Sequence, residues 1–445
     1  MRCPMLKSIL SCRISIRRLT FIAGIILTLP LTGQSMAERK ELFDDGEFFF
    51  NSEDYKEAVF YYQKLQAINP ANGNINFQLG MCYINIPGEE PKAIPYLEKA
   101  IEKISVKYKK STFEETRAPL HAYFYLAQAY RINNQLDKAL QMLDKFTSSK
   151  YFEGNYNQGI VTTEVEACKR AKVIQDKPIE AAFEKLPEPI NTSVDNFNAV
   201  VSADETVIFY MTNKKFYNAV MMSRKVDGVW TEPENITPQV GSDGDCYPTS
   251  ISADGKDLYL VKKVKNNNDI FVSHWDNDKW SLMIPLNENI NSSKSETHAC
   301  ISPDGSELYF TSNRKGSLGG IDIWRSKKEN GDWGKAENLG ASVNTELDED
   351  SPFLSSSGEL LYFSSQGHQN MGGFDIFYSR KKGSEWSAAA NLGFPVNTTS
   401  DNKFWCPVGK GTTGYLTRKT DDASLMDIYR VSITGGDQLK DLLSE

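Results

Sequence analysis

The stretch ISPDGSELYF, residues 301–310, decides the fold of the C-terminal half of this 445-residue chain. Its Asp-Gly pair is a strong signal for a tight hairpin turn, and the apolar triplet that follows favours a strand. An aromatic residue at the position of Tyr309 recurs at intervals of 50 or 53 residues, which indicates an internal repeat. The recurring residues are Phe209, Tyr259, Tyr309, Tyr362 and Tyr415.

The same register carries two further strands in each unit. An Asp-Ile pair predicts a third strand, and a tryptophan followed by Asn or Leu predicts a fourth. Four short strands in a unit of about 50 residues, repeated about five times, are typical of a β-propeller. We therefore expect five blades within residues 181–436, with six as the alternative. The marker residues are Asp269, Asp322, Asp375 and Asp427 on the third strand and Trp230, Trp280, Trp333 and Trp386 on the fourth.

Residues 38–180 carry a shorter period, near 34 residues, and read as helices. Small residues at Gly46 and Ala58 allow two antiparallel helices to approach closely. Tyr62 and Leu65 are then expected to fill the groove toward the next helix pair. The N-terminal half is therefore expected to be a helical solenoid, which makes the whole chain a multidomain α plus all-β protein.

Similar sets of residues begin at Gly80 and Ala127. The pattern resembles the tetratricopeptide repeat (TPR) and implies three helix pairs, with residues 161–174 as a capping helix. The charged stretch 101–119, between the second and third pairs, is expected to lengthen one helix and its loop.

The first 37 residues predict a secretory signal peptide. An arginine-rich segment precedes an apolar run over residues 19–31, which is too short to cross a bilayer that needs about 20 helical residues. No cysteine stands at the end of this run, so we expect no lipid anchor. The mature protein is expected to be exported, without direct membrane insertion, and to end in a short tail over residues 437–445.

Composition excludes several function classes. A net charge of −8 and a pI near 5.4 argue against binding to nucleic acid or to an anionic membrane surface. Phosphate-binding, zinc-binding and hydrolase motifs are absent from the sequence, so we assign no catalytic, cofactor or metal residue. The five cysteines that follow the signal peptide are expected to be buried apolar residues. They are Cys82, Cys168, Cys246, Cys300 and Cys406.

One set of acidic residues precedes the predicted inner strands and marks a possible binding ring at the propeller mouth. The simpler interpretation is that these side chains cap turns and link blades. The sharper one is that converging carboxylates bind a cation or a basic segment of a partner. The set is Asp195, Asp245, Glu296, Asp348, Glu349 and Asp401.

The strings SPDG (302–305), SNR (312–314) and GGIDIW (319–324) resemble the TolB-type propeller repeat over about residues 187–436. A signal peptide, a TPR array and such a propeller together resemble periplasmic, outer-membrane-associated proteins of Bacteroidetes-type envelopes, including one linked to type IX secretion. That relative continues into an OmpA-like domain that binds peptidoglycan. The present sequence runs only about ten residues past the last predicted strand, so we do not expect peptidoglycan binding. The resemblance implies a periplasmic scaffold or adaptor, peripherally associated with the outer membrane, whose partners are envelope proteins.

A glycan-binding module and a propeller glycoside hydrolase are the two alternatives to the scaffold. A hydrolase needs two or three acids at non-repeating positions of different blades. Here the acids recur in register, which favours blade construction, so we expect no enzymatic activity. A peptide is expected to bind in the TPR groove, lined by helices at about residues 41–50, 75–83 and 120–130.

Overall fold

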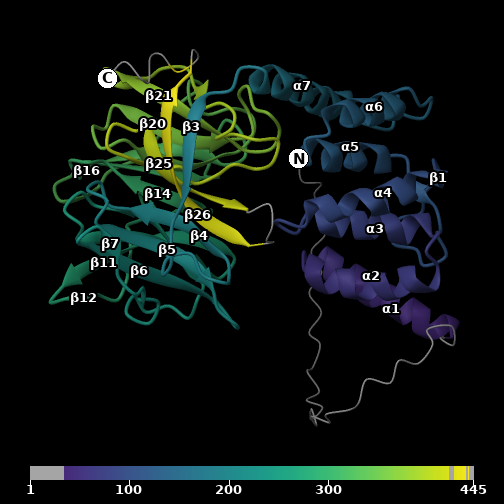
Figure 1. Cartoon of the computed structure of the whole chain (residues 1–445), viewed down its shortest axis with the longest axis horizontal. Helices are drawn as coiled ribbons and strands as arrows, with labels where there is room; N and C mark the ends of the chain where they lie inside the picture. The colour runs from purple at the N-terminus through teal and green to yellow at the C-terminus, as the bar shows by residue number, and fades with distance from the viewer. Residues whose placement is uncertain (1–34, 420–424, 437–438, 440–445) are drawn as a thin grey trace, which may run out of the picture.

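The computed structural model describes residues 35–419, 425–436 and 439. They form a helical domain followed by a five-bladed β-propeller (Figure 1), which confirms the fold class predicted from the sequence. The predicted signal peptide lies outside the described residues up to position 34, and the predicted tail lies outside them apart from Leu439. No helix within the described part of the chain is long and apolar enough to span a membrane.

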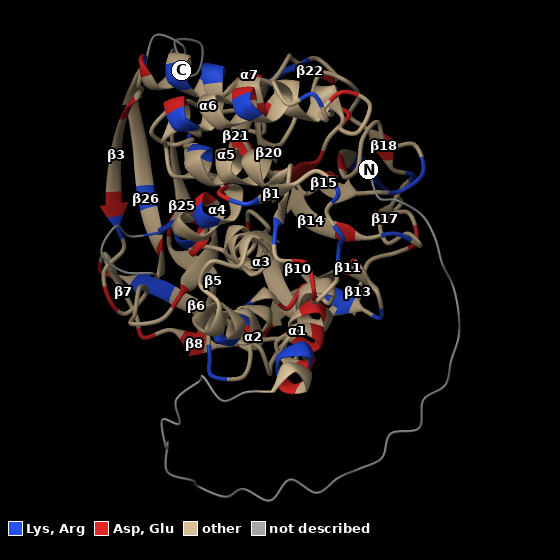
Figure 2. Ribbon diagram, turned by 90° about the vertical axis from the view of Figure 1, so that its right-hand side faces the viewer, with Lys and Arg blue, Asp and Glu red and all other residues tan. Residues whose placement is uncertain are grey.

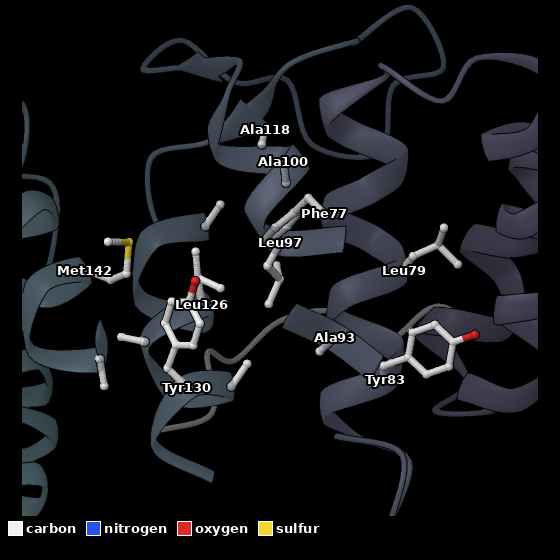
Figure 3. Close-up of a cluster of buried hydrophobic side chains, with 14 of the residues drawn as sticks. Phe77, Leu79, Tyr83, Ala93, Leu97, Ala100, Ala118, Leu126, Tyr130 and Met142 are labelled. Atoms are coloured by element: carbon white, nitrogen blue, oxygen red, sulfur yellow. The ribbon is translucent and has the colours of Figure 1, made fainter. Parts of the chain in front are cut away.

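The helical domain consists of three antiparallel helix pairs and a capping helix. The approach of α1 to α2 is so close that a Cβ atom on Gly46 would lie 2.8 Å from the Tyr62 ring. Leu97 and Leu126 are fully buried in the core that successive pairs share (Figure 3). The elements are α1 (Met36–Asn51), α2 (Tyr55–Ile68), α3 (Gly73–Ile84), η2 (Glu90–Lys92), α4 (Ala93–Ile101), α5 (Ala122–Ile132), α6 (Leu136–Thr147) and α7 (Gln158–Gln175).

The stretch 101–119 does not lengthen a helix, so that part of the prediction is wrong, whereas the expected longer connection is present between α4 and α5. Helix α4 ends at Ile101, and the chain instead forms a parallel pair of short strands, β1 (Ile104–Ser105) and β2 (Ala118–Pro119). The segment between them folds back over the first helices, because Tyr108 and Phe113 gain aromatic contacts there.

The propeller strands follow one another in chain order from the centre of each blade outward, and five inner strands contact one another in a closed ring. Blade 1 comprises β4 (Asn196–Val201), β5 (Val207–Asn213), β6 (Asn218–Val226), β7 (Val229–Trp230) and β8 (Glu234–Asn235). Blade 2 comprises β9 (Cys246–Ile251), β10 (Asp257–Val264), β11 (Asn267–Asp276), β12 (Lys279–Trp280) and β13 (Ile284–Pro285). Blade 3 comprises β14 (Glu296–Ile301), β15 (Glu307–Ser312), β16 (Asp322–Glu329), β17 (Asp332–Trp333) and β18 (Glu337–Asn338).

Blade 4 comprises β19 (Glu349–Leu354), β20 (Leu360–Ser365), β21 (Asp375–Lys382), β22 (Glu385–Trp386) and β23 (Ala390–Asn391). Blade 5 comprises β24 (Cys406–Val408), β25 (Thr413–Lys419), β26 (Met426–Gly435) and, from before blade 1, β3 (Glu180–Lys185). The aromatic residues that define the repeat are all buried on the second strands, as the register predicts. The five described cysteines are buried and free, as expected.

The outer strand of blades 1 to 4 is broken rather than continuous. In blade 1, for example, β7 and β8 both pair with β6. The tryptophan of each short outer strand packs toward the preceding blade: the Trp280 ring lies 5.5 Å from Phe209, and the Trp386 ring lies 5.9 Å from Tyr309. These edge-on contacts seal the seams between blades.

An asparagine fastens the end of the outer strand to the third strand in four blades. The Asn344 side chain donates to the Ile323 carbonyl at 2.9 Å and accepts from the Ile323 amide at 2.8 Å. Blade 1 has Gly241 at this position, and there the Thr237 hydroxyl accepts from the amide of Val220. The asparagine pairs are Asn291 with Ile270, Asn344 with Ile323, Asn397 with Ile376 and Asn191 with Ile428.

The ring is closed by its two ends. Strand β3 pairs antiparallel with β26, so the first strand of the propeller sequence completes the last blade. Asn191 then bonds Ile428 in both directions, as the other asparagines do within one blade. Closure removes an edge of β26 that could otherwise pair with another chain.

We predict that a truncated chain that begins at Asn196 is much less stable than one that begins at Lys177. Loss of β3 removes a six-residue strand, and at about 1 kcal/mol per hydrogen bond this should lower the melting temperature by roughly 10 °C or more. Thermal unfolding followed by circular dichroism, with light scattering to detect aggregation, measures both effects. Equal melting temperatures would contradict a role of β3 in closure.

Candidate functional site

The acidic residues predicted to ring the propeller mouth lie in the loops that lead into the inner strands or at the first residues of those strands. In the described part of the chain, no group of three or more His, Cys, Asp or Glu side chains is placed to hold a metal ion. The members also differ in exposure, so they are not one uniform set. Glu296 and Glu349 are fully buried, Asp195 and Asp348 half-buried, and Asp245 and Asp401 exposed.

The two buried glutamates hold their own blades together. Glu349 accepts hydrogen bonds from the amide and hydroxyl of Thr345 and from the Ser365 hydroxyl, at 2.6 to 2.8 Å. Burial raises the pKa of Glu349 from 4.5 to about 7, although these hydrogen bonds oppose the shift. Its carboxyl group is therefore shielded from any partner at the mouth.

Three of the four aspartates of this set link neighbouring blades, whereas Asp245 accepts from the Ser242 hydroxyl of its own loop. Asp348 accepts from the amide of Ile321 at 2.8 Å, and Asp401 accepts from the amide of Phe374 at 3.0 Å. Asp195 does the same for Met426, at 2.9 Å, across the closing seam. Turn capping and interblade bonding therefore account for these side chains, while binding of a basic segment by the exposed members stays a prediction.

A second cluster, which the sequence reasoning missed, lies one residue further along the inner strands. Asp350 stands at its centre, with Lys403 Nζ at 3.4 Å, the Thr297 hydroxyl at 3.4 Å and His298 Nδ1 at 3.4 Å. Burial alone would raise the pKa of Asp350, but His298 and Lys403 together hold it well below its usual range. This position differs in every blade, which is a signal that a register comparison could have found: the five residues are Phe197, Tyr247, Thr297, Asp350 and Lys403.

The chemistry available at the mouth does not favour glycoside hydrolysis. A hydrolase needs one carboxyl group that stays protonated and can reach the sugar, and a second that is ionised. The neighbours of Asp350 hold its pKa low, so this carboxyl group is ionised, and Glu349, whose pKa lies near neutrality, is fully buried behind its own donors.

The predicted peptide groove of the solenoid is covered by the chain itself. Phe43 and Phe77 are 34 residues apart and take equivalent places on α1 and α3. The Phe113 ring lies 5.9 Å from Phe43, and the Tyr108 ring lies 6.4 Å from Phe77. The Tyr108 hydroxyl also donates to Asn74 at 2.6 Å. The returning segment between β1 and β2 therefore packs against α1 and α3, two of the helices expected to line the groove.

The solenoid and the propeller meet at a buried junction. Arg131, at the end of α5, bonds Glu164 of α7 at 2.5 Å and donates to the carbonyl of Thr399 in the loop before β24, also at 2.5 Å. Its side chain is only 6% exposed. A Cβ atom on Gly372 would lie 2.4 Å from Arg131 Nη1, so this loop of blade 4 needs glycine to let the arginine through.

Further contacts extend the junction along α7 and the end of α5. The hydroxyl groups of Thr399 and Ser400 donate to the carbonyl of Ile132, which the end of a helix leaves without an intrahelical partner. Arg170 bonds the Asn370 side chain and carbonyl at 2.9 to 3.0 Å, and Met371 is buried in the core of the solenoid. The helices thus lie along one face of the propeller and are fixed at blades 4 and 5 (Figures 1 and 2).

The raised pKa of Glu349 predicts a pH dependence of stability. The folded protein keeps this proton up to about pH 7, whereas the unfolded chain releases it near pH 4.5, so the free energy of unfolding falls as pH rises between these values. Glu349→Gln should flatten this fall in urea unfolding measured from pH 4.5 to 8. Asp348→Asn, on the same loop, is the control, and an unchanged slope in Glu349→Gln would contradict the assignment.

Arg131→Met should destabilise the protein by about 3–5 kcal/mol, because it leaves the Glu164 carboxylate buried without a partner. The double variant Arg131→Met/Glu164→Gln should lose less than the single one. Lys169→Met breaks an exposed ion pair with Glu166 on α7, the helix that carries Glu164, and should lower the free energy of unfolding by at most about 1 kcal/mol. Urea unfolding measures the free energy of unfolding of all three variants. A double variant less stable than Arg131→Met would contradict the ion-pair account.

Comparison with known proteins gives a match to the tetratricopeptide repeat family over residues 46–72. No curated protein sequence matches the chain. Among solved structures, TolB from Acinetobacter baumannii is similar to 55% of this chain at 17% identity, with a TM-score of 0.37, and the match covers 56% of the TolB chain. The α-L-arabinofuranosidase PaAbf62A from Podospora anserina is similar to 58% of this chain and 98% of its own, at 11% identity and a TM-score of 0.38.

The type III secretion chaperone SycD from Yersinia enterocolitica is similar to 31% of this chain and 97% of its own, at 17% identity and a TM-score of 0.25. The chain therefore contains a TPR repeat, and its five-bladed propeller has TolB among its structural neighbours. TPR arrays and propellers generally mediate contacts between proteins, so this architecture suggests a protein-interaction scaffold.

Proposed function

We propose that this protein is an exported scaffold of the bacterial envelope, which holds other proteins together within a secretion or outer-membrane assembly. We place it in the periplasm, peripherally associated with the outer membrane. The buried Arg131 junction carries the scaffold proposal, because it joins two repeat domains that can each present a surface to a partner. The envelope location rests on the predicted signal peptide and on the resemblance to TPR and propeller proteins of Bacteroidetes-type envelopes.

The surfaces available to partners lie outside the covered groove. Large apolar side chains are exposed on both domains, which marks sites of contact with other proteins when they cluster. Phe48 and Phe60 of the first helix pair are 65% and 51% exposed. On blade 1, Phe216 at the tip of the β5–β6 hairpin is 86% exposed. We therefore propose that partners dock on the first repeat and on blade 1.

The test is site-specific photo-cross-linking in envelope fractions, with the photoreactive residue at Phe48 or at Phe216. Each site should give its own specific protein partner, identified by mass spectrometry. A photoreactive residue at Lys110, in the segment over the groove, is the control. Absence of a specific partner at both exposed sites, with turnover of a glycan by the purified protein, would overturn the scaffold in favour of a hydrolase.

Ala139→Arg should remove capture by the solenoid while the propeller stays folded. Ala139 is fully buried on α6, so an arginine there forces the helices apart and buries a charge, at a cost of several kcal/mol. The exposed neighbour Lys138→Glu is the matched control and should retain capture. Cross-linking at Phe48 reports the loss, and full capture by Ala139→Arg would show that the solenoid does not hold that partner.

A further inference from the structure

The seam beside blade 3 contains a binding site for a guanidinium group, filled by the chain itself. Arg314 follows the second strand of this blade and is 12% exposed. It donates to the carbonyl of Asn289 at 2.8 Å and to the carboxylate of Glu296 at 3.1 Å. Its guanidinium carbon lies 4.8 Å from the centre of the Phe310 ring and 5.5 Å from that of Trp324. This combination of acceptors and aromatic faces is what a guanidinium prefers.

The equivalent seam beside blade 4 is filled in the same way by an imidazole. His368 Nε2 lies 2.8 Å from the carbonyl of Val343, which is the counterpart of the Ile290 carbonyl that accepts from Arg314 in the preceding blade. The His368 ring lies 5.8 Å from Phe363 and 5.2 Å from Phe377. In two blades, then, a nitrogen-bearing side chain from the loop after the second strand occupies the seam.

Beside blade 1 the same place is a cavity of about 510 Å³. Lys214 stands where blade 3 has Arg314, but its side chain is exposed, and its amide is engaged by the carbonyl of Tyr217 in a tight hairpin. Tyr210 and Met221 take the places of the two aromatic rings. The cavity is lined by Pro189, Thr192, Asn196, Tyr210, Thr212 and Met221, and Lys214 is part of the lining as well.

The cavity presents acceptors and negative charge. Asn196 takes the place of Glu296 and is 1% exposed, and its amide group donates to the carbonyl of Val194. Its Oδ1 atom has no hydrogen-bond donor among the described residues. A buried acceptor without a donor is unfavourable, so a donor from outside is expected to complete it. The carboxylates of Glu188 and Glu232 stand at the rim of the cavity.

We propose that the blade 1 cavity is a socket for a guanidinium group, the arginine side chain of a partner protein. The socket would reproduce with an external arginine the arrangement that Arg314 makes internally. Exposed Phe216 on the adjoining hairpin would contact the residues beside that arginine, as aromatic anchors do in protein interfaces. The partner as the source of the arginine rests on the proposed scaffold function, whereas the chemistry of the socket does not.

An ammonium group does not fit the socket equally well. The planar guanidinium carries five donors and stacks on flat faces, whereas the ammonium of lysine is a compact and strongly hydrated charge. Lys214 accordingly lines the cavity with a side chain that is exposed, whereas Arg314 is buried in its own seam. The same difference gives a direct test of selectivity.

Isothermal titration of the full chain should use four probes: N-acetyl-arginine amide, the neutral isostere N-acetyl-citrulline amide, N-acetyl-lysine amide and free arginine. The arginine amide should bind at least about tenfold more tightly than the citrulline and lysine amides, because charge-assisted and bidentate hydrogen bonds are the stronger ones. Free arginine that binds more tightly than the amide would identify a free amino acid, not a protein side chain, as the ligand. Equal binding of arginine and citrulline amides, or binding of neither, would overturn the socket.

Two variants locate the binding on blade 1. Lys214→Arg should fill the socket from within, raise the melting temperature and abolish binding of the arginine amide. Lys215→Arg, the next residue, makes the same chemical change outside the cavity walls and should leave binding unchanged. Glu232→Gln should weaken binding several-fold through loss of rim charge. Unchanged binding in Lys214→Arg would overturn the assignment.

A third variant provides an internal comparison. Arg314→Ala empties the blade 3 seam, so the protein should then bind two arginine amides in place of one and regain thermal stability in their presence. If Arg314→Ala does not fold, the binding measured with Lys214→Arg decides whether blade 1 holds the socket. Arginine binding without any cross-linked partner at Phe216 would count against the scaffold and not the socket, and the reverse result would count against the socket alone.

Discussion

The pairing of β3 with β26 is the constraint on which the rest of the molecule depends. It joins residues about 250 positions apart, such as Phe183 and Val431, and turns an open row of blades into a ring. Helix α7 ends at Gln175 and β3 begins at Glu180, so the same strand also anchors the last helix against blade 5. The buried contacts of Arg131 follow from that placement, because they need the end of α5 to lie over the loop before β24. The strand that closes the ring, β3, thus also places the solenoid beside the propeller.

The blades share a frame and differ where the frame leaves room. The asparagine that bonds both backbone groups of an isoleucine recurs in four blades and fastens the chain after the outer strand to the third strand. Blade 1 departs from the frame at Gly241 and at Ala219, where other blades carry asparagine and aspartate. The same blade holds the open cavity and the most exposed aromatic residue, Phe216. Loss of structural side chains therefore coincides with features suited to binding.

The periodicity of the sequence predicts most of the strands and helices of this fold. The recurrence of Tyr309 and its equivalents placed every second strand. The spacing of 34 residues likewise placed the helix pairs. Each of these features repeats along the chain, so a single sequence contains several copies of the evidence for it.

What periodicity could not predict depends on contacts that occur once. The segment 102–117 interrupts the repeat, and its packing against the first helices becomes visible only through contacts such as Phe113 on Phe43 and Tyr108 on Phe77. Asp350 forms its cluster with Lys403 and His298, which belong to other blades and stand at different positions of the repeat from one another. The acidic residues of the mouth lie where the inner strands begin, but their partners, such as the amide of Ile321 for Asp348, belong to the neighbouring blade.

The late arrival of β26 has a consequence for the synthesis of the chain. Strand β3 emerges early and waits for a partner that lies about 240 residues further on, while blades 1 to 4 can form from neighbouring hairpins. A lone strand with free backbone groups risks pairing with other nascent chains. Glu180, Glu184 and Lys185 are exposed along β3 even in the closed ring, and charged side chains of this kind oppose such pairing. The sequence EAAFEK thus suits a strand that must remain unpaired, yet unaggregated, until the rest of the propeller has been made.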